Sequence, residues 1–300
     1  MSVASQDEAP SSIDTFALAG AAVLTAAIAF ALGIVLGPSP LVLGLVVAAF
    51  AALYFGLSGR SRRRRAVARR PFPSAWRSVL ERSVTFYRGL DDRARQRFER
   101  EVAWFLDEQR ISGPQAAPID DDIRVLVAAS AVTLSFGRPG YTWPRARDVV
   151  VYGDAFDEEY RVAREGSVLG MVHAQGPIVL SSRALRHGFK SVDDGLNVGL
   201  HELAHVLDFE TGSADGIPSM MPWRSIEPWL GLMHSEITRV KKHKSLLRKY
   251  AATNDAEFFA VATEAFFERP RALRARHADL YDMLVETYGQ DPAAREETRR

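Results

Sequence analysis

The stretch HELAHVLDFETG, residues 201–212, places two histidines four positions apart, with a glutamate directly after the first. Residues at i and i+4 of an α-helix project from one face about one turn apart, so His201 and His205 can share one metal ion. Glu202 leaves the helix about 100° further round, where it can reach a water in an open coordination position. The spacing therefore predicts a hydrolytic zinc site. The alternative is that both histidines are hydrogen-bonded core residues.

The flanking residues predict that this stretch is a largely buried helix. Ser191 and Asp194 resemble a capping pair, and Gly212 marks the end. Apolar residues recur between them at helical spacing, namely Leu196, Leu200, Leu203, Val206 and Leu207. Histidines and carboxylates, including Asp208, are costly to bury unpaired on such a helix. A metal and the groups that orient its ligands would explain them.

The composition limits the chemistry of any metal site. The chain has 300 residues, of which 47% are hydrophobic and 25% charged, which is typical of one or two globular domains. The net charge of +1 excludes no class of partner. Cysteine is absent, which excludes disulfides, thiolate catalysis and zinc bound by cysteine. A third metal ligand must therefore be His, Asp or Glu.

The N-terminal quarter of the chain carries a long apolar segment. No charged residue lies between Thr15 and Gly59, and the turn sequence GPSP, residues 37–40, divides this segment into two halves near the ~20 residues that span a bilayer. We therefore predict a transmembrane helical hairpin over residues 15–58, in contact with lipid. A cleaved signal peptide fits less well, because the residues before it are acidic. A buried core hairpin is a second alternative.

An arginine-rich segment follows the apolar one. RSRRRRAVARR, residues 60–70, holds seven arginines. Positive charge stays on the cytoplasmic side of a membrane, so this segment predicts a multi-pass inner-membrane protein with a cytoplasmic catalytic domain. Nucleic-acid binding is the alternative, but interleaved aromatic residues are lacking. We therefore expect contact with anionic lipid and no nucleic-acid partner.

These features give an α+β fold, mainly helical with a small sheet. We expect an acidic tail over 1–14, the hairpin over 15–58, a basic linker over 59–73, a zinc-hydrolase domain over 74–293 and a charged tail over 294–300. Within the domain, periodicity predicts helices over 90–110, 120–136, 233–249 and 254–270. Strands are expected over 148–156 and 176–182, and Pro177 points to an edge position for the second.

Five downstream residues are candidates for the third ligand, namely His234, Glu236, His243, Glu257 and Glu264. The two histidines lie among Lys and Arg, which is typical of a solvated face. Glu257 and Glu264 lie seven apart on one face of an otherwise apolar helix, where acids need partners. Composition alone does not choose between them.

The segments NVGLHELAHVLD and YAATNDAEFFAVATEAFF resemble the Mlc titration factor A family of zinc metallopeptidases. The resemblance extends from about Pro71 to about Pro292, from FPSAW to YGQDP. AEFFA after a tyrosine-containing turn also resembles, more distantly, the catalytic domain of anthrax lethal factor. The family resemblance implies a zincin-like domain that binds Zn²⁺.

The family resemblance also implies roles for individual residues. It makes His201, His205 and Glu257 the zinc ligands, Glu202 the general base, and Tyr250 an active-site residue that hydrogen-bonds the oxyanion. Glu264 and Asp208 then become candidates for residues that orient the ligands.

The implied activity is hydrolysis of peptide or protein substrates, aminopeptidase-like on small ones. Separately, an exposed edge strand over 176–182 could pair with an extended substrate; the alternative is a plain structural edge strand. A transcriptional repressor is a partner that the resemblance implies. The alternative function is a membrane-tethered binding protein that sequesters a transcriptional regulator and uses its metal only as a structural element. An intact Glu202 argues against this alternative, because a structural site needs no base.

Overall fold

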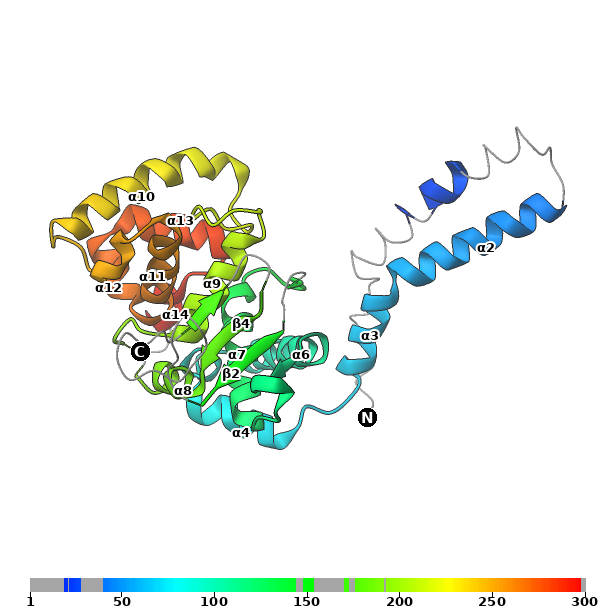
Figure 1. Cartoon of the computed structure of the whole chain (residues 1–300), viewed down its shortest axis with the longest axis horizontal. Helices are drawn as coiled ribbons and strands as arrows, with labels where there is room; N and C mark the ends of the chain where they lie inside the picture. The colour runs from blue at the N-terminus through cyan, green and yellow to red at the C-terminus, as the bar shows by residue number, and fades with distance from the viewer. Residues whose placement is uncertain are drawn as a thin grey trace. The chain divides into compact units, whose positions relative to one another are not determined.

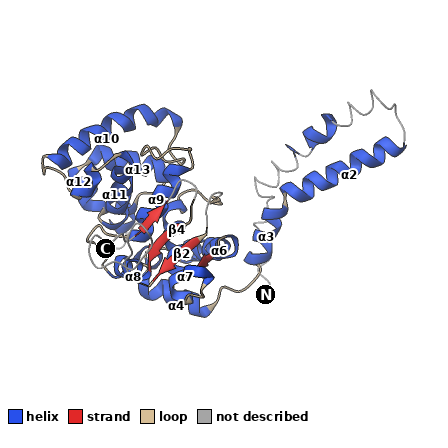
Figure 2. Ribbon diagram, in the orientation of Figure 1, coloured by secondary structure: helices blue, strands red, loops and turns tan. Residues whose placement is uncertain are grey.

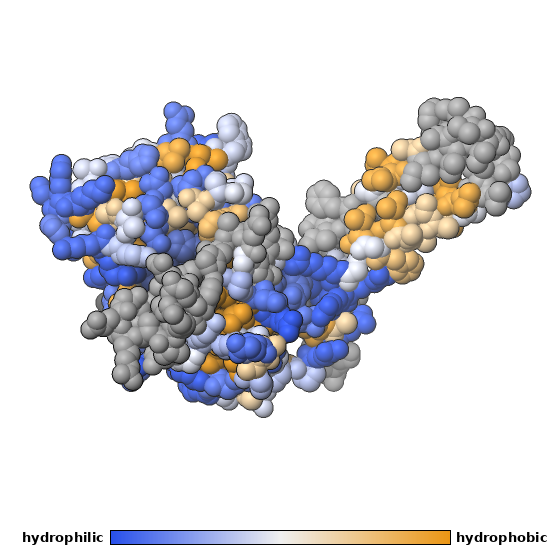
Figure 3. Space-filling model, in the orientation of Figure 1, coloured by the Kyte–Doolittle hydropathy of each residue, from blue (hydrophilic) through white to orange (hydrophobic). Residues whose placement is uncertain are grey.

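The computed structural model of this chain describes residues 19–20, 22–27, 40–143, 148–153, 170–172, 176–191 and 193–297. The chain divides into two compact units, Met1–Pro71 and Phe72–Arg300. The N-terminal unit contains α2 (Pro40–Leu57) and α3 (Gly59–Ala68). Helix α2 has no charged residue, and hydrophobic residues gather along it (Figure 3). Helix α3 carries most of the arginine run, so residues 59–68 of the expected linker are helical.

The prediction of a multi-pass inner-membrane protein is wrong. Among the residues that the structure describes, no single helix is long and apolar enough to cross a membrane. Leu43–Leu57 and Gly59–Ala68 pass that test only as a pair, and this pair is bent by 48°. The 18 residues of α2 rise about 27 Å, short of the ~30 Å of a bilayer core, and arginines follow at once. The first expected span lies mostly outside the described residues.

The second unit contains the remaining elements, arranged around a small sheet (Figures 1 and 2). Its α-helices are α4 (Ser74–Ser83), α5 (Thr85–Arg88), α6 (Asp92–Glu108), α7 (Asp121–Ser135), α8 (Ser182–Lys190), α9 (Val198–Phe209), α10 (Ile226–Lys241), α11 (Asp255–Glu268), α12 (Pro270–Arg276), α13 (Ala278–Tyr288) and α14 (Pro292–Glu297). Three 3-10 turns are η1 (Pro114–Ala116), η2 (Trp223–Ser225) and η3 (Lys249–Ala252). The strands are β1 (Ile111–Ser112), β2 (Val149–Tyr152), β3 (Gly170–Val172) and β4 (Ile178–Ser181). The expected mainly helical fold with a small sheet is confirmed.

The four strands form one sheet in the order β1-β2-β4-β3. β1, β2 and β4 are parallel, and β3 runs antiparallel to β4. The prediction that residues 176–182 form an edge strand is therefore wrong, because β4 has a neighbour on each side. Pro177 directly precedes the first strand residue, Ile178. Because Pro177 lies outside the strand, its lack of an N–H removes no hydrogen bond between strands.

Three largely buried helices, α7, α9 and α11, contribute to the core beside this sheet. α9 packs against α7, α11 and the strands β3 and β4. Most residues of α7 and of α11 are buried. The Trp229 ring of α10 lies against Phe258 and Phe259 of α11, with centroids 5.9 and 6.2 Å apart. Burial on several sides fixes α9 and α11 against each other, and these two helices carry the predicted metal ligands and Glu202.

Several helix boundaries differ from those predicted. α9 begins at Val198 rather than near Ser191, because Gly195 adopts a φ of +74° that no α-helix includes. Asp194 accepts a hydrogen bond from the Leu196 N–H at 2.9 Å and so forms a local turn instead of a cap. α10 ends at Lys241, and His243 adopts a φ of +55°, so the expected helix over 233–249 stops early.

Candidate metal centre

Helix α9 positions the two histidines. The Asn197 side chain accepts a hydrogen bond from the Leu200 N–H at 3.2 Å and so satisfies one of the unpaired donors of the first turn. His201 and His205 follow on the same face, one turn apart, with ring centroids separated by 4.9 Å. Both residues are 8% exposed. The helix therefore presents two imidazoles side by side from a rigid, buried element.

Helix α11 brings a carboxylate to the same place. Asn254 caps this helix by accepting a hydrogen bond from the Glu257 N–H at 2.8 Å, which fixes the first turn. Glu257 Oε2 lies 3.1 Å from His201 Nε2 and 3.5 Å from His205 Nε2. One ligand atom from each of the three residues lies within 4.8 Å of the others. Residues separated by more than fifty positions in sequence thus converge on one point.

The charges around this point fit a cation. Burial opposes protonation of His201, but the adjoining carboxylates of Glu257 and Glu264 outweigh it and raise the pKa of His201 to about 10. Burial raises the pKa of Glu202, and the neighbouring histidines oppose this effect. Burial also acts to raise the pKa of Glu257, yet hydrogen bonds to the two histidines bring it below its usual range. Two imidazoles and one carboxylate are a donor set of catalytic zinc. The residues present therefore fit a divalent metal.

Glu264, the other acidic candidate of α11, lies behind His201 rather than beside both imidazoles. Its Oε2 is 3.2 Å from His201 Nδ1, the ring nitrogen that points away from Glu257. Its Oε1 accepts a hydrogen bond from the Asn197 N–H at 2.8 Å. Arg248 forms an ion pair with the same carboxylate. Glu264 therefore links α9, α11 and the segment before η3, and it is placed to orient the His201 ring.

Tyr250 lies at the open side of this group. It belongs to η3, is 49% exposed, and its ring centroid lies 6.0 Å from that of His201. Partial burial and the adjoining charge of Glu257, to which the phenol is hydrogen-bonded, raise the pKa of Tyr250 to about 12. The hydroxyl therefore stays protonated at neutral pH and available as a hydrogen-bond donor.

Asp208 contacts a loop rather than the imidazole of His205. Its Oδ2 accepts a hydrogen bond from the Gly216 N–H at 3.0 Å, and within the described part of the chain Oδ1 has no hydrogen-bond partner. The Gly216 carbonyl in turn accepts from Trp229 Nε1 at 2.7 Å. Burial raises the pKa of Asp208 to about 6. This residue therefore anchors the chain between α9 and α10.

The other ligand candidates lie elsewhere. The side chain of His234 is 62% exposed, and His243 is exposed beyond the end of α10. Glu236 is buried and pairs with His277 Nδ1 at 2.8 Å.

Sequence reasoning missed two residues of the centre, Asn197 and Arg248. The signal for Asn197 was its position directly before the helical repeat that contains both histidines. Arg248 had no signal, since it lies in a run of basic residues.

Comparisons with known proteins agree with this geometry. The model of a family described as glucose-regulated metallo-peptidase M90 matches residues 58–289. An uncharacterized protein of Synechocystis is 29% identical over 77% of this chain and 89% of its own length. The Mlc titration factor A of Pectobacterium atrosepticum is 30% identical over 73% of this chain and 87% of its own length. The same-named protein of Cronobacter sakazakii is 29% identical over 74% and 88%.

The family match covers both segments that the sequence resemblance singled out, whereas the likeness to the lethal factor catalytic domain stays a prediction. The match includes α9 with both histidines, η3 with Tyr250, and α11 with Glu257. The chain therefore belongs to the glucose-regulated metallo-peptidase M90 family.

Proposed function

We propose that this protein is a zinc-dependent peptidase with His201, His205 and Glu257 as the metal ligands. The observation that carries the proposal is the convergence of their ligand atoms within 4.8 Å of one another, from two helices fixed by core packing. Three protein ligands leave a coordination position open, which is typical of catalytic rather than structural zinc. The finer assignment of a zincin-like fold is part of this proposal.

Glu202 is proposed as the general base. It follows the first ligand on α9, is 4% exposed, and forms none of the ion pairs that engage Glu257 and Glu264. Zinc, when bound, polarises the attacking water and the carbonyl of the scissile bond. Glu202 then accepts the proton of that water and delivers it to the leaving amine. A carboxyl group whose pKa is raised by burial suits this role, because it accepts a proton more readily than an exposed carboxylate does.

Tyr250 is proposed to stabilise the oxyanion. Its hydroxyl is protonated at neutral pH and its ring lies beside His201, so it can donate a hydrogen bond where negative charge develops. Its partial exposure leaves it accessible to a substrate, which supports this role. The substrates are peptides or proteins, and the family resemblance supports an aminopeptidase-like preference for small ones.

A regulator-binding protein with a structural metal is the competing function. The relatives named Mlc titration factor A support a link to a regulator. A purely structural site, however, has no use for a buried glutamate next to its ligands, because burying an unpaired carboxylate is costly. Glu202 therefore favours hydrolysis, with regulator binding as an additional property.

Metal dependence tests the proposal. Purified full-length protein should contain about one equivalent of Zn²⁺, hydrolyse a mixture of short peptides, lose this activity to a chelator, and regain it on addition of Zn²⁺. Hydrolysis that survives complete metal removal would contradict the proposed chemistry. Bound zinc without hydrolysis of any peptide would favour the binding protein instead.

A further inference from the structure

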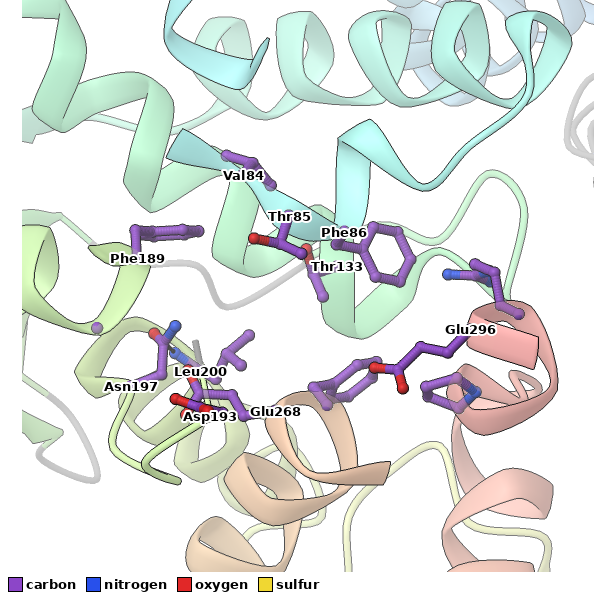
Figure 4. Close-up of a pocket in the computed structure, with 14 residues that line it drawn as sticks. Val84, Thr85, Phe86, Thr133, Phe189, Asp193, Asn197, Leu200, Glu268 and Glu296 are labelled. Carbon is purple, nitrogen blue, oxygen red and sulfur yellow. Dashed lines mark hydrogen bonds between the residues drawn. The ribbon is translucent and has the colours of Figure 1, made fainter. Parts of the chain in front are cut away.

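The position of η3 decides where Tyr250 lies relative to the metal centre. A pocket of about 230 Å³ lies near the start of α9 (Figure 4), but neither the proposed ligands nor Tyr250 line it. Tyr250 instead lies half-exposed in η3, with its ring centroid 6.0 Å from that of His201. The contacts that hold η3 in place therefore bear directly on the proposed reaction.

The local structure of η3 does little to fix its position. It is a single 3-10 turn of four residues, and Arg248, which precedes it, provides no side-chain cap. Helices α10 and α11 pack against it, and its Ala251 is buried. The chain reaches η3 from the end of α10, where His243 adopts a φ of +55° and redirects the backbone. The contacts of residues 245–248 therefore help to set where η3 begins.

His277 supplies one of these contacts. This histidine lies between α12 and α13, is 4% exposed, and its Nε2 accepts a hydrogen bond from the Leu246 N–H at 3.0 Å. Because Nε2 is an acceptor, the proton of the neutral imidazole lies on Nδ1. The Ser245 hydroxyl lies 3.5 Å from the same Nε2 and accepts a hydrogen bond from the Leu247 N–H at 3.2 Å. The imidazole thus anchors the segment before η3.

Glu236 of α10 holds the other side of this imidazole. Its Oε2 lies 2.8 Å from His277 Nδ1, and its Oε1 accepts a hydrogen bond from Arg239 at 3.0 Å. Both Glu236 and His277 are almost fully buried, so losing a partner is costly for either group. A carboxylate next to Nδ1 favours the tautomer in which Nε2 is free to accept. Glu236 therefore holds the ring in the form that can bind Leu246.

The anchored segment leads directly to groups of the metal centre. Arg248, two residues after Leu246, forms an ion pair with Glu264. Tyr250, four residues after Leu246, lies beside His201. A displacement of about 1 Å at a group that binds the transition state can lower a rate by about 100-fold. Loss of the anchor would therefore reach the reaction through Tyr250.

We propose that His277 is a positioning residue for the peptidase reaction. It acts through the N–H of Leu246, which holds the segment before η3 so that Tyr250 lies beside His201. This inference rests on the proposed function, in which Tyr250 stabilises the oxyanion. A role of this kind predicts a loss of kcat in protein that still holds zinc.

Two substitutions separate the two contacts of His277. The amide of His277→Asn reaches the position of Nδ1, next to Glu236, but not that of Nε2. The longer side chain of His277→Gln brings its amide oxygen within reach of the Leu246 N–H. With zinc bound, kcat for peptide hydrolysis should fall at least about tenfold in His277→Asn and stay within about threefold of wild type in His277→Gln. Wild-type kcat in His277→Asn would overturn the proposal, as would an equal loss in both variants.

A double-mutant cycle tests whether the effect passes through Tyr250. Adding His277→Asn to Tyr250→Phe should lower kcat by no more than about twofold, because the hydroxyl that would be displaced is already absent. If the two losses multiply, His277 acts elsewhere and the proposal is contradicted. Tyr281→Phe is the control on α13, since it removes a hydroxyl that donates to Asp291 at 2.5 Å. It should keep wild-type kcat.

Hydrogen exchange of residues 245–250 provides a measurement that needs no activity. Exchange should be faster in His277→Asn than in wild type, because the Leu246 N–H loses its acceptor, and near wild type in His277→Gln. Wild-type exchange in His277→Asn would overturn the anchoring role. If wild-type protein hydrolysed no peptide, the proposed function would fail, and exchange would still decide on the anchor.

Ser245→Ala tests the same link from its other side if His277→Asn does not fold. Ser245 is only partly buried, and its hydroxyl contacts both the Leu247 N–H and His277. Its loss should speed exchange of residues 245–250 and lower kcat about threefold or more. Wild-type exchange and wild-type kcat in this variant would overturn the proposal.

Discussion

Glu264 lies 3.2 Å from Nδ1 of His201, while the opposite ring nitrogen of the same histidine lies 3.1 Å from Glu257. The two carboxylates of α11 therefore lie on either side of one imidazole, and only Glu257 also approaches His205. Carboxylates on the far nitrogen of a metal-bound histidine fix its tautomer and orientation. We therefore propose different roles for the two acids, although they lie seven residues apart on one helix.

The first prediction separates these roles. Glu257→Gln should lose most of its zinc, because it removes one of three ligands. Glu264→Gln should retain zinc with an affinity about 10- to 100-fold weaker, as is typical when a residue that orients a ligand is changed. Metal analysis and competition with a chelator measure both effects. Glu227→Gln, an exposed glutamate of α10, is the control. The opposite ranking of the two α11 variants would refute the assignment.

The second prediction concerns Tyr250. Tyr250→Phe keeps the ring beside His201 but removes the hydroxyl, so zinc content should remain at the wild-type level. The kcat for peptide hydrolysis should fall by about 10²- to 10³-fold, the usual effect of losing one oxyanion donor. Tyr141→Phe, which removes a hydroxyl that contacts Glu210, should leave kcat unchanged. A kcat for Tyr250→Phe within a factor of two or so of wild type would exclude the proposed donor role.

The third prediction concerns the loop between α9 and α10, which approaches the start of α11 at Gly216. Gly216 has a φ of +74°, and a Cβ there would lie 2.5 Å from the Asp255 carbonyl oxygen, at the start of α11. Gly216→Ala should therefore lower the free energy of unfolding by more than ~1 kcal/mol. Gly231→Ala is the matched control, because that helical position has open space around it. It should raise the free energy of unfolding by ~0.5–1 kcal/mol. Denaturant titration distinguishes the two, and equal effects would contradict the packing described.

The fourth prediction concerns pH. Burial raises the folded-state pKa of Glu268 from 4.5 to about 8, so the folded protein holds a proton that the unfolded chain releases. The contribution of Glu268 to stability is therefore fully present below pH 4.5 and is lost as pH rises towards 8. Glu268→Gln cannot ionise, so its stability relative to wild type should increase across this interval. Urea denaturation at several pH values measures the difference. A constant difference would show that Glu268 titrates normally.

The sequence predicted the centre of the site better than its surroundings. His201 and His205 share a face because of helix periodicity, which is visible in sequence, whereas the approach of Glu257 depends on how α11 packs against α9. The choice of Glu257 over Glu264 came from the family resemblance, since both acids have the same spacing and apolar neighbours. Arg248 could not be predicted, because its pairing with Glu264 depends on how the segment before η3 folds back.

Each wrong prediction from the sequence has a physical cause. Pro177 suggested an edge strand, but strand order depends on long-range pairing of β4 with β2 and β3. Ser191 and Asp194 suggested a helix start, but a left-handed Gly195 interrupts the chain. The membrane prediction relied on an absence of charge and on the length of each apolar half, whereas no single described helix is long and apolar enough to cross a bilayer.

Glu202→Gln tests the central claim most directly. This variant keeps the size of the side chain but cannot accept a proton, so its zinc content should equal that of wild type, while kcat for peptide hydrolysis falls by about 10²- to 10⁴-fold. Both quantities can be measured on the same purified sample. Wild-type zinc with wild-type hydrolysis would contradict the account, because the buried glutamate beside the first histidine would then have no part in the reaction.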